Sequence, residues 1–304
     1  MTRLCLLIAP WLVGLAAVMG VAGQQRPTFR IDVDLVTVDV SVSRGGHPVS
    51  GLTLENFTVF DNGVTQRLEG IVAERVPLDA FLVLDTSGSV AGVRSLQVKS
   101  AAEAFLDGLS LQDRASLITF SHQILVRCPL TADRGAVRRS VLSFADSRGG
   151  TALYDATYLA LRLPQPGQRR TVAVVFTDGL DNASWLSQDR VVDAATRSDV
   201  IIYGVTLSDE VSPANVSPNV VRIENQSSYK FLRSASDATG GRLFHAATDS
   251  RLRDVFARVL EDVRARYLLR YSPDKITPGW HKLEVRLQGV RGDVTARRGY
   301  FAAR

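Results

Sequence analysis

Oxygen-bearing side chains stand in three separate segments of this sequence, and together they could bind a metal ion. Asp85, Ser87 and Ser89 stand in LVLDTSGSV, Thr151 in GGTALYDA, and Asp178 in VVFTDG. Each lies where an apolar run gives way to Gly, Ser or Thr, which is where an α/β protein places its ligand-binding loops. Carboxylate, hydroxyl and water oxygens suit a small hard cation. We therefore expect a Mg²⁺ site, with Mn²⁺ or Ca²⁺ as alternative ions.

Short, nearly continuous apolar runs predict the strands that position these residues. The runs are AFLVL, ASLITF, TVAVVF and VIIYGVTL, and they fit strands covered by helices on both faces. Amphipathic segments at 95–109 and 252–263 predict helices. This alternation predicts an α/β fold with a doubly wound, mainly parallel sheet. QILVRCPL follows ASLITF too closely for a crossover helix, so we expect an antiparallel edge hairpin.

Strands without helical partners are predicted at both ends of the chain. FRIDVDLVTVDVSV alternates with a two-residue period, and a hairpin is expected around Asp61-Asn62-Gly63. After residue 266, RYLLRYS, WHKLEVRLQ and VTARRGYFA again read as strands. Each set is too small to be stable alone, so we expect 24–76 and 267–304 to form one β domain, with 77–266 inserted as the α/β domain. A separate β extension at each end is the alternative.

The first segment, 1–23, has a basic start, an apolar stretch and small residues before Gln24. This pattern predicts a secretory signal cleaved near Gly23, and hence a secreted, periplasmic or cell-envelope protein with no stable transmembrane segment after cleavage. An uncleaved membrane anchor is the alternative. Only Cys128 would remain, so an internal disulfide is excluded. The strong preference for arginine over lysine favours a bacterial source.

Composition narrows the function classes. A chain of 304 residues with 45% hydrophobic content can bury a sizeable core. The basic residues between 251 and 270 alternate with apolar positions of a helix, so we expect no nucleic acid as a partner. The sequence contains no GxxxxGK[ST] or GxSxG motif, and Asp85 begins no DxDxT motif, so we do not expect an enzyme. The histidines lack metal-ligand spacing, which disfavours zinc.

The order of four motifs carries a family resemblance. DTSGS, GGTALYDA, TDGLDN and ATGGRLF resemble those of von Willebrand factor A domains, over residues 79–267, and the β flanks look like those of bacterial exported relatives. The resemblance implies a metal-ion-dependent adhesion site. Ser87, Ser89 and Thr151 would approach the metal with hydroxyls, and Asp85 and Asp178 would act directly or through waters. It also implies a protein-binding module for adhesion or interaction.

An octahedral ion held by few protein groups keeps a position open for another oxygen. We therefore expect a protein ligand that presents Asp or Glu to the metal. Asp181, Asn182 and Trp185 would hold the metal ligands in place or form the rim that contacts the partner. Without a metal, Asp85 and Asp178 could instead cap loops. A structural subunit of a cell-envelope assembly and a Mg²⁺-dependent hydrolase are the alternative functions. The partner and the oligomeric state stay open.

Overall fold

The largest sheet has six strands in the order β11-β10-β9-β6-β7-β8. The computed structural model describes residues 35–72, 76–147, 149–164, 169–207, 227–273, 275 and 277–302. The strands of this sheet are β6 (Leu78–Asp85), β7 (Arg114–Phe120), β8 (Ile124–Thr131), β9 (Arg170–Thr177), β10 (Ile201–Leu207) and β11 (Leu243–Ala246). Neighbours are parallel except β7 and β8, which form the predicted antiparallel edge hairpin.

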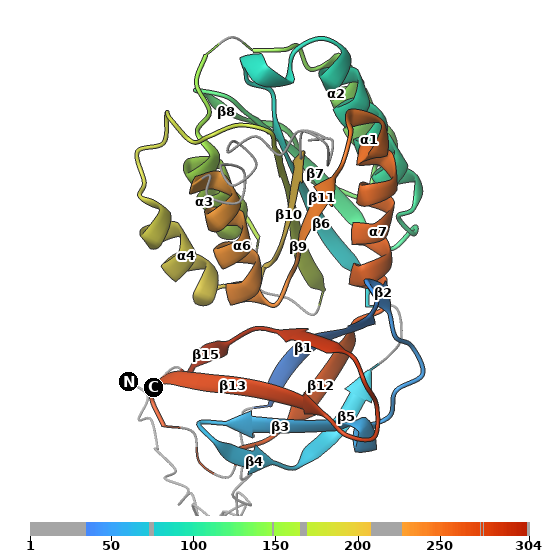
Figure 1. Ribbon diagram of the computed structural model, residues 1–304, viewed down its shortest axis with the longest axis vertical. Coiled ribbons are helices and arrows are strands. Elements are labelled where there is room, and N and C mark those ends of the chain that lie inside the picture. Colours follow the sequence, from blue (N-terminus) through green and yellow to red (C-terminus); the bar gives the residue numbers. More distant parts are fainter. Residues whose placement is uncertain are drawn as a thin grey trace, which may run out of the picture. The chain divides into compact units, whose positions relative to one another are not determined.

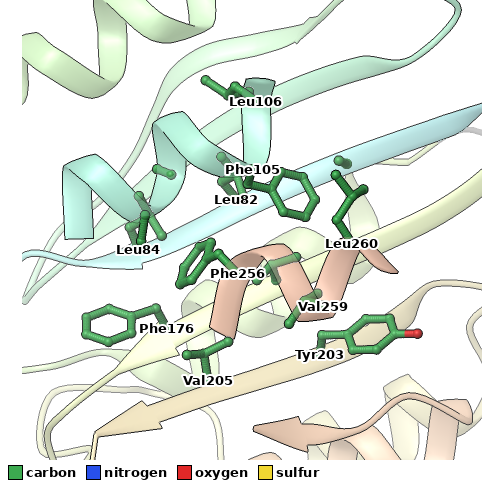
Figure 2. Packing of buried hydrophobic residues seen from close by; sticks show 14 of the residues in the cluster. Leu82, Leu84, Phe105, Leu106, Phe176, Tyr203, Val205, Phe256, Val259 and Leu260 are labelled. Carbon is green, nitrogen blue, oxygen red and sulfur yellow. The ribbon is translucent and has the colours of Figure 1, made fainter. Parts of the chain in front are cut away.

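Helices cover both faces of this sheet (Figure 1). They are α1 (Val93–Asp107), α2 (Arg134–Ser143), α3 (Leu153–Arg162), α4 (Gln188–Thr196), α6 (Ser227–Thr239) and α7 (Leu252–Arg264). One apolar core joins the sheet to α1, α2 and α7, and another joins the opposite face to α3, α4 and α6. Figure 2 shows Phe105 of α1 and Phe256 of α7 near Leu82 and Leu84 of β6. The doubly wound α/β fold expected from the sequence is confirmed.

Strands from the two ends of the chain interleave in two smaller sheets. Their orders are β14-β1-β12-β5, with β2 on β1, and β15-β13-β3-β4. The strands are β1 (Val36–Arg44), β2 (His47–Pro48), β3 (Phe57–Asp61), β4 (Val64–Gln66), β5 (Leu68–Val72), β12 (Tyr267–Tyr271), β13 (Gly279–Leu287), β14 (Asp293–Ala296) and β15 (Gly299–Ala302). Their buried side chains form one core. Strands from both ends of the chain thus share this core, as the expected fold class requires, and the domain bounds 24–76, 77–266 and 267–304 stay a prediction.

Some predictions differ from the structure or fall outside it. The predicted signal, 1–23, and the start of the predicted first strand before residue 35 lie outside the described residues. The sequence of 208–229 is rich in Pro, Asn and Ser and predicts a long polar loop. This prediction is wrong at the end of the loop, because α6 begins at Ser227; residues 208–226 lie outside the described part. Among the described residues, no helix is long and apolar enough to span a membrane.

Candidate metal centre

Two aspartates emerge at the same edge of the six-stranded sheet. Asp85 is the last residue of β6, and Asp178 follows Thr177, the last residue of β9. β6 and β9 are parallel neighbours, with Leu84 paired to Phe176. Asp85 is fully buried, and the side chain of Asp178 is only 3% exposed. The carboxyl ends of two adjacent strands therefore place both carboxylates at one edge, where such sheets bind ligands.

Hydrogen bonds hold the Asp85 carboxylate from two sides. Its Oδ1 accepts from the backbone N–H of Ser87 at 2.8 Å, and its Oδ2 accepts from the Thr177 hydroxyl at 2.6 Å. Burial is the largest influence on this carboxyl and, with the charge of Asp178, raises its pKa to about 6, although the hydrogen bonds oppose the rise. Ionised Asp85 is therefore costly for the protein alone, and a neighbouring cation would favour the ionised form.

Hydroxyl contacts connect the loop after β6 to Asp178. Ser87 Oγ lies 3.2 Å from Ser89 Oγ, and the Ser89 hydroxyl donates to Asp178 Oδ1 at 2.7 Å. Both serines belong to the β6–α1 loop, in which a short 3-10 helix spans Gly88–Val90. The loop thus carries two hydroxyls across the sheet edge, from the end of β6 to the end of β9.

Thr151 is held at the same place by Asn182. The Thr151 N–H donates to Asn182 Oδ1 at 2.7 Å, and the Asn182 N–H donates to the Thr151 carbonyl at 3.0 Å. Gly150 permits this contact, because a Cβ there would lie 2.4 Å from Asn182 Oδ1. A Cβ on Gly179 would lie 3.5 Å from both Thr151 Oγ1 and Ser89 Oγ, so these two hydroxyls border one small space.

The other two residues expected at the rim have different positions. The carboxylate of Asp181 accepts from the Tyr154 N–H at 3.0 Å and from the Ser184 hydroxyl at 2.5 Å, so it holds the start of α3. Trp185 is 96% exposed, and its backbone N–H donates to Asp155 at 2.8 Å. The β9–α4 loop is therefore fixed to α3 at two points, while the Trp185 indole faces solvent.

Two residues at the site were not predicted from the sequence. Thr177 donates to Asp85, and Arg94 forms an ion pair with Asp178 Oδ2 while donating to the Ser89 carbonyl at 3.2 Å. The sequence did offer a signal for Thr177, which is a hydroxyl residue directly before Asp178 at the strand end. It offered none for Arg94, because that residue reaches Asp178 only through the fold.

The donor set fits a small divalent cation. Within the described residues, no group of three or more His, Cys, Asp or Glu side chains gathers as a metal cluster. Hydroxyls must therefore supplement the two carboxylates, and hard oxygen donors of this kind suit Mg²⁺ better than zinc. The side chains that could hold the ion are Asp85, Ser87, Ser89, Thr151 and Asp178.

Comparison with known families agrees with this fold. Residues 80–180, which include all five candidate ligands, match the von Willebrand factor type A domain family. A structure described as von Willebrand factor type A from Catenulispora acidiphila aligns with a TM-score of 0.51 at 13% identity, covering 86% of this chain and 70% of that chain. Within this chain, residues 80–180 therefore resemble a von Willebrand factor type A domain in sequence.

Other proteins are similar to parts of this chain in fold or in sequence. Proximal thread matrix protein 1 from the mussel byssus aligns with a TM-score of 0.51 at 14% identity, over 67% of this chain and 50% of that chain. Another structure of the mussel protein is described as having a zinc-occupied MIDAS motif, where MIDAS stands for metal-ion-dependent adhesion site. The Synechocystis protein sll0103 is 35% identical over 108 residues, or 34% of this chain. The bovine inter-alpha-trypsin inhibitor heavy chain H4 is 28% identical over 116 residues, or 34% of this chain. The matches span 26% and 13% of these two curated relatives.

Proposed function

We propose that the protein is an exported module that binds a protein partner through a divalent metal ion, with Mg²⁺ as the preferred ion. Asp85, Ser87, Ser89, Thr151 and Asp178 hold the ion in this proposal. The supporting observation is the gathering of two carboxylates and three hydroxyls from three chain segments at one sheet edge. When bound, the ion would act as a Lewis acid for a partner's Asp or Glu carboxylate.

The surrounding residues keep the donors in place before a partner arrives. Ser87 and Thr177 orient the Asp85 carboxylate, and Asn182 fixes the backbone of Thr151. Arg94 offsets part of the negative charge through its ion pair with Asp178. Because these groups are already ordered, little conformational freedom is lost on binding, which supports a recognition role.

Trp185 is a further contact in this proposal. Its side chain is 96% exposed, and Asp155 holds the backbone of the loop on which it stands. A large aromatic ring on a fixed loop is typical of the residues that supply most binding energy at interfaces. The partner would then present an apolar surface next to its acidic residue.

Donor chemistry and the N-terminal sequence support the remaining parts of the proposal. Oxygen donors favour Mg²⁺ or Mn²⁺. The zinc described in the mussel protein makes Zn²⁺ a necessary third ion in any titration. Export rests on the apolar and small residues of segment 1–23. The periplasm, the cell envelope and the medium are the proposed locations.

A pull-down from envelope extract tests the function. Wild type should retain a partner in Mg²⁺, lose it in EDTA and recover it when Mg²⁺ is restored. Asp178→Ala should retain none. Asp193→Ala is the matched control and should behave as wild type, because its side chain is 63% exposed on α4, outside the proposed ligands.

Three outcomes would contradict the proposal. Retention of the partner by Asp178→Ala in EDTA would indicate permanent docking through another surface, as in a structural subunit. Equal loss of the partner by Asp178→Ala and Asp193→Ala would show that binding has no specific requirement for the proposed site. Metal-dependent release of product from phosphate esters, lost in Asp178→Ala, would indicate a hydrolase.

A further inference from the structure

A cleft of about 730 Å³ lies at the opposite edge of the six-stranded sheet from Asp85 and Asp178. Its lining includes the first residues of β9 and β10, whereas the aspartates lie at the carboxyl ends of β6 and β9. The outer face of β1 and β12 forms its other wall. The cleft is therefore separate from the candidate metal centre, and its volume is in the range of small-molecule sites.

Strand alternation explains why polar groups face this cleft. Val36 and Val38 of β1 turn into the core of the β domain, so Thr37 and Asp39 turn outward and line the cleft. On the adjacent strand β12, Arg270 is paired with Thr37 and lines the same cleft. This wall thus presents a hydroxyl, a carboxylate and a guanidinium side by side.

Positive charge exceeds negative charge among the lining side chains. The charged lining residues are Arg169, Arg170, Arg270 and Arg297, with Asp39 and Asp199. Three of these arginines have a carboxylate partner: Arg169 pairs with Asp79, Arg170 with Asp39, and Arg297 with Asp199. Within the described part of the chain, the side chain of the exposed Arg270 has no hydrogen bond or ion pair, although its backbone is paired in the sheet. Its guanidinium donors are therefore free for a ligand.

Buried ion pairs keep the cleft walls at a fixed spacing. Arg170 is 2% exposed at its side chain; it donates to Asp39 Oδ2 at 2.6 Å and to the Val263 carbonyl at 3.0 Å. Arg266 is fully buried between Asp39 and Asp262. These contacts tie β1 of the β domain to β9 and α7 of the α/β domain. A ligand would therefore enter a site that is already formed.

We infer that this cleft binds a small organic anion whose carboxylate or phosphate group contacts Arg270. The guanidinium matches the planar or paired oxygens of both groups and can bind them through two hydrogen bonds. Leu268 and Val72 on the β-domain wall, and Ile201 on the other wall, contact the apolar part of the ligand. Because the guanidinium itself supplies the positive charge that pairs with the anion, binding requires no metal.

Calorimetric titration of the whole protein in EDTA tests this inference with hexanoate, hexyl phosphate and inorganic phosphate as probes. Wild type should bind at least one probe with a Kd below about 1 mM, and Arg270→Gln should weaken that binding at least about tenfold. Arg270→Lys should weaken it less, because the charge is kept and only the paired geometry is lost. Arg286→Gln is the matched control, since Arg286 is an exposed arginine of β13 outside the cleft lining.

The probes distinguish the two ligand chemistries. Tighter binding of hexanoate indicates a carboxylate ligand, and tighter binding of either phosphate probe indicates a phosphate ligand. Absence of binding by all three probes at about 10 mM would overturn the inference. Binding that is equal in wild type and Arg270→Gln would also overturn it, as would equal weakening by Arg286→Gln. Thermal unfolding of each variant verifies that it is folded.

Discussion

Replacing Asp85 with asparagine should stabilise the metal-free protein while abolishing the proposed binding of a divalent ion. The Asp85 carboxyl is fully buried, and its pKa is raised from 3.8 to about 6, mainly by burial. A shift of this size corresponds to about 3 kcal/mol between the ionised and the protonated forms. Asparagine has the shape of the protonated form and lacks the charge. Asp85→Asn should therefore raise the free energy of unfolding by up to about 3 kcal/mol at pH 8.

The hydrogen bonds of Asp85 allow this substitution. The asparagine Oδ1 can still accept from the Ser87 N–H, as the carboxylate does at 2.8 Å. Thr177 Oγ1 can accept from the new amide and turn its own proton toward the Gly179 carbonyl, which lies 3.4 Å away. Both hydrogen bonds of the carboxylate then have a replacement, while the second N–H of the amide gains neither partner, so about 3 kcal/mol is an upper bound on the effect of the removed charge.

The advantage of Asp85→Asn must depend on pH. The folded protein holds the Asp85 proton more tightly than the unfolded chain, so wild type gains stability as pH falls through about 6 toward 3.8. The difference in free energy of unfolding between variant and wild type should have its full size at pH 8, fall to about half at pH 5, and vanish below the pKa of Asp85 in the unfolded chain.

Urea denaturation in EDTA at pH 8, 6 and 5 measures this gap. Asp193→Asn is the control, because this carboxylate is 63% exposed and its replacement should leave stability nearly unchanged at every pH. A variant equal to wild type or less stable at pH 8 would refute the reasoning, as would a gap that does not change with pH.

Three further predictions concern other parts of the structure. Gly150→Ala should weaken Mg²⁺ binding measured by calorimetry, because its Cβ would lie 2.4 Å from Asn182 Oδ1. Gly88→Ala should bind Mg²⁺ as wild type does, because its Cβ meets nothing within 4 Å. Equal affinities of the two variants would contradict this prediction. Arg266→Met should lower the free energy of unfolding by up to about 3 kcal/mol, because Asp39 and Asp262 each lose one of two arginine partners and keep only Arg170 and Arg242. A loss under about 1 kcal/mol in urea denaturation would count against this prediction. The pKa of His281 is raised because hydrogen-bond acceptors at both ring nitrogens outweigh the opposing effect of burial. Wild type should therefore be more stable than His281→Phe below about pH 6.5, and this advantage should decline as the pH rises through the folded pKa of His281. A stability difference that grows with pH would contradict this prediction.

Local patterns in the sequence predicted most of the fold. β6 and β9 are covered on both faces, so their apolar runs are continuous. β1 turns only one face into the core of the β domain and carries polar residues on the other, so its sequence alternates. The pairing of strands from the two ends followed from a different argument, since neither set could bury a core alone. The end of the polar loop before α6 was wrong, because Ser227 and Ser228 are typical of loops yet begin this helix.

The site was predictable where chemistry follows a strand end. Asp85 and Asp178 stand directly after apolar runs, so their shared edge follows from parallel strand direction. Arg94 was missed because its contact with Asp178 joins positions 84 residues apart, and no local pattern encodes such a pairing. Asp181 has the residue type of a site ligand, but its carboxylate holds the start of α3.

Calorimetric titration of Mg²⁺, Mn²⁺ and Zn²⁺ into the metal-free protein tests the central claim most directly. Wild type should bind Mg²⁺ or Mn²⁺, and Asp85→Ala and Thr151→Ala should each weaken that binding at least about tenfold. Asp193→Ala should leave it unchanged. Two results would contradict the assignment of a metal centre to Asp85, Ser87, Ser89, Thr151 and Asp178. In the first, both site variants bind Mg²⁺ and Mn²⁺ as tightly as wild type does. In the second, wild type binds neither ion.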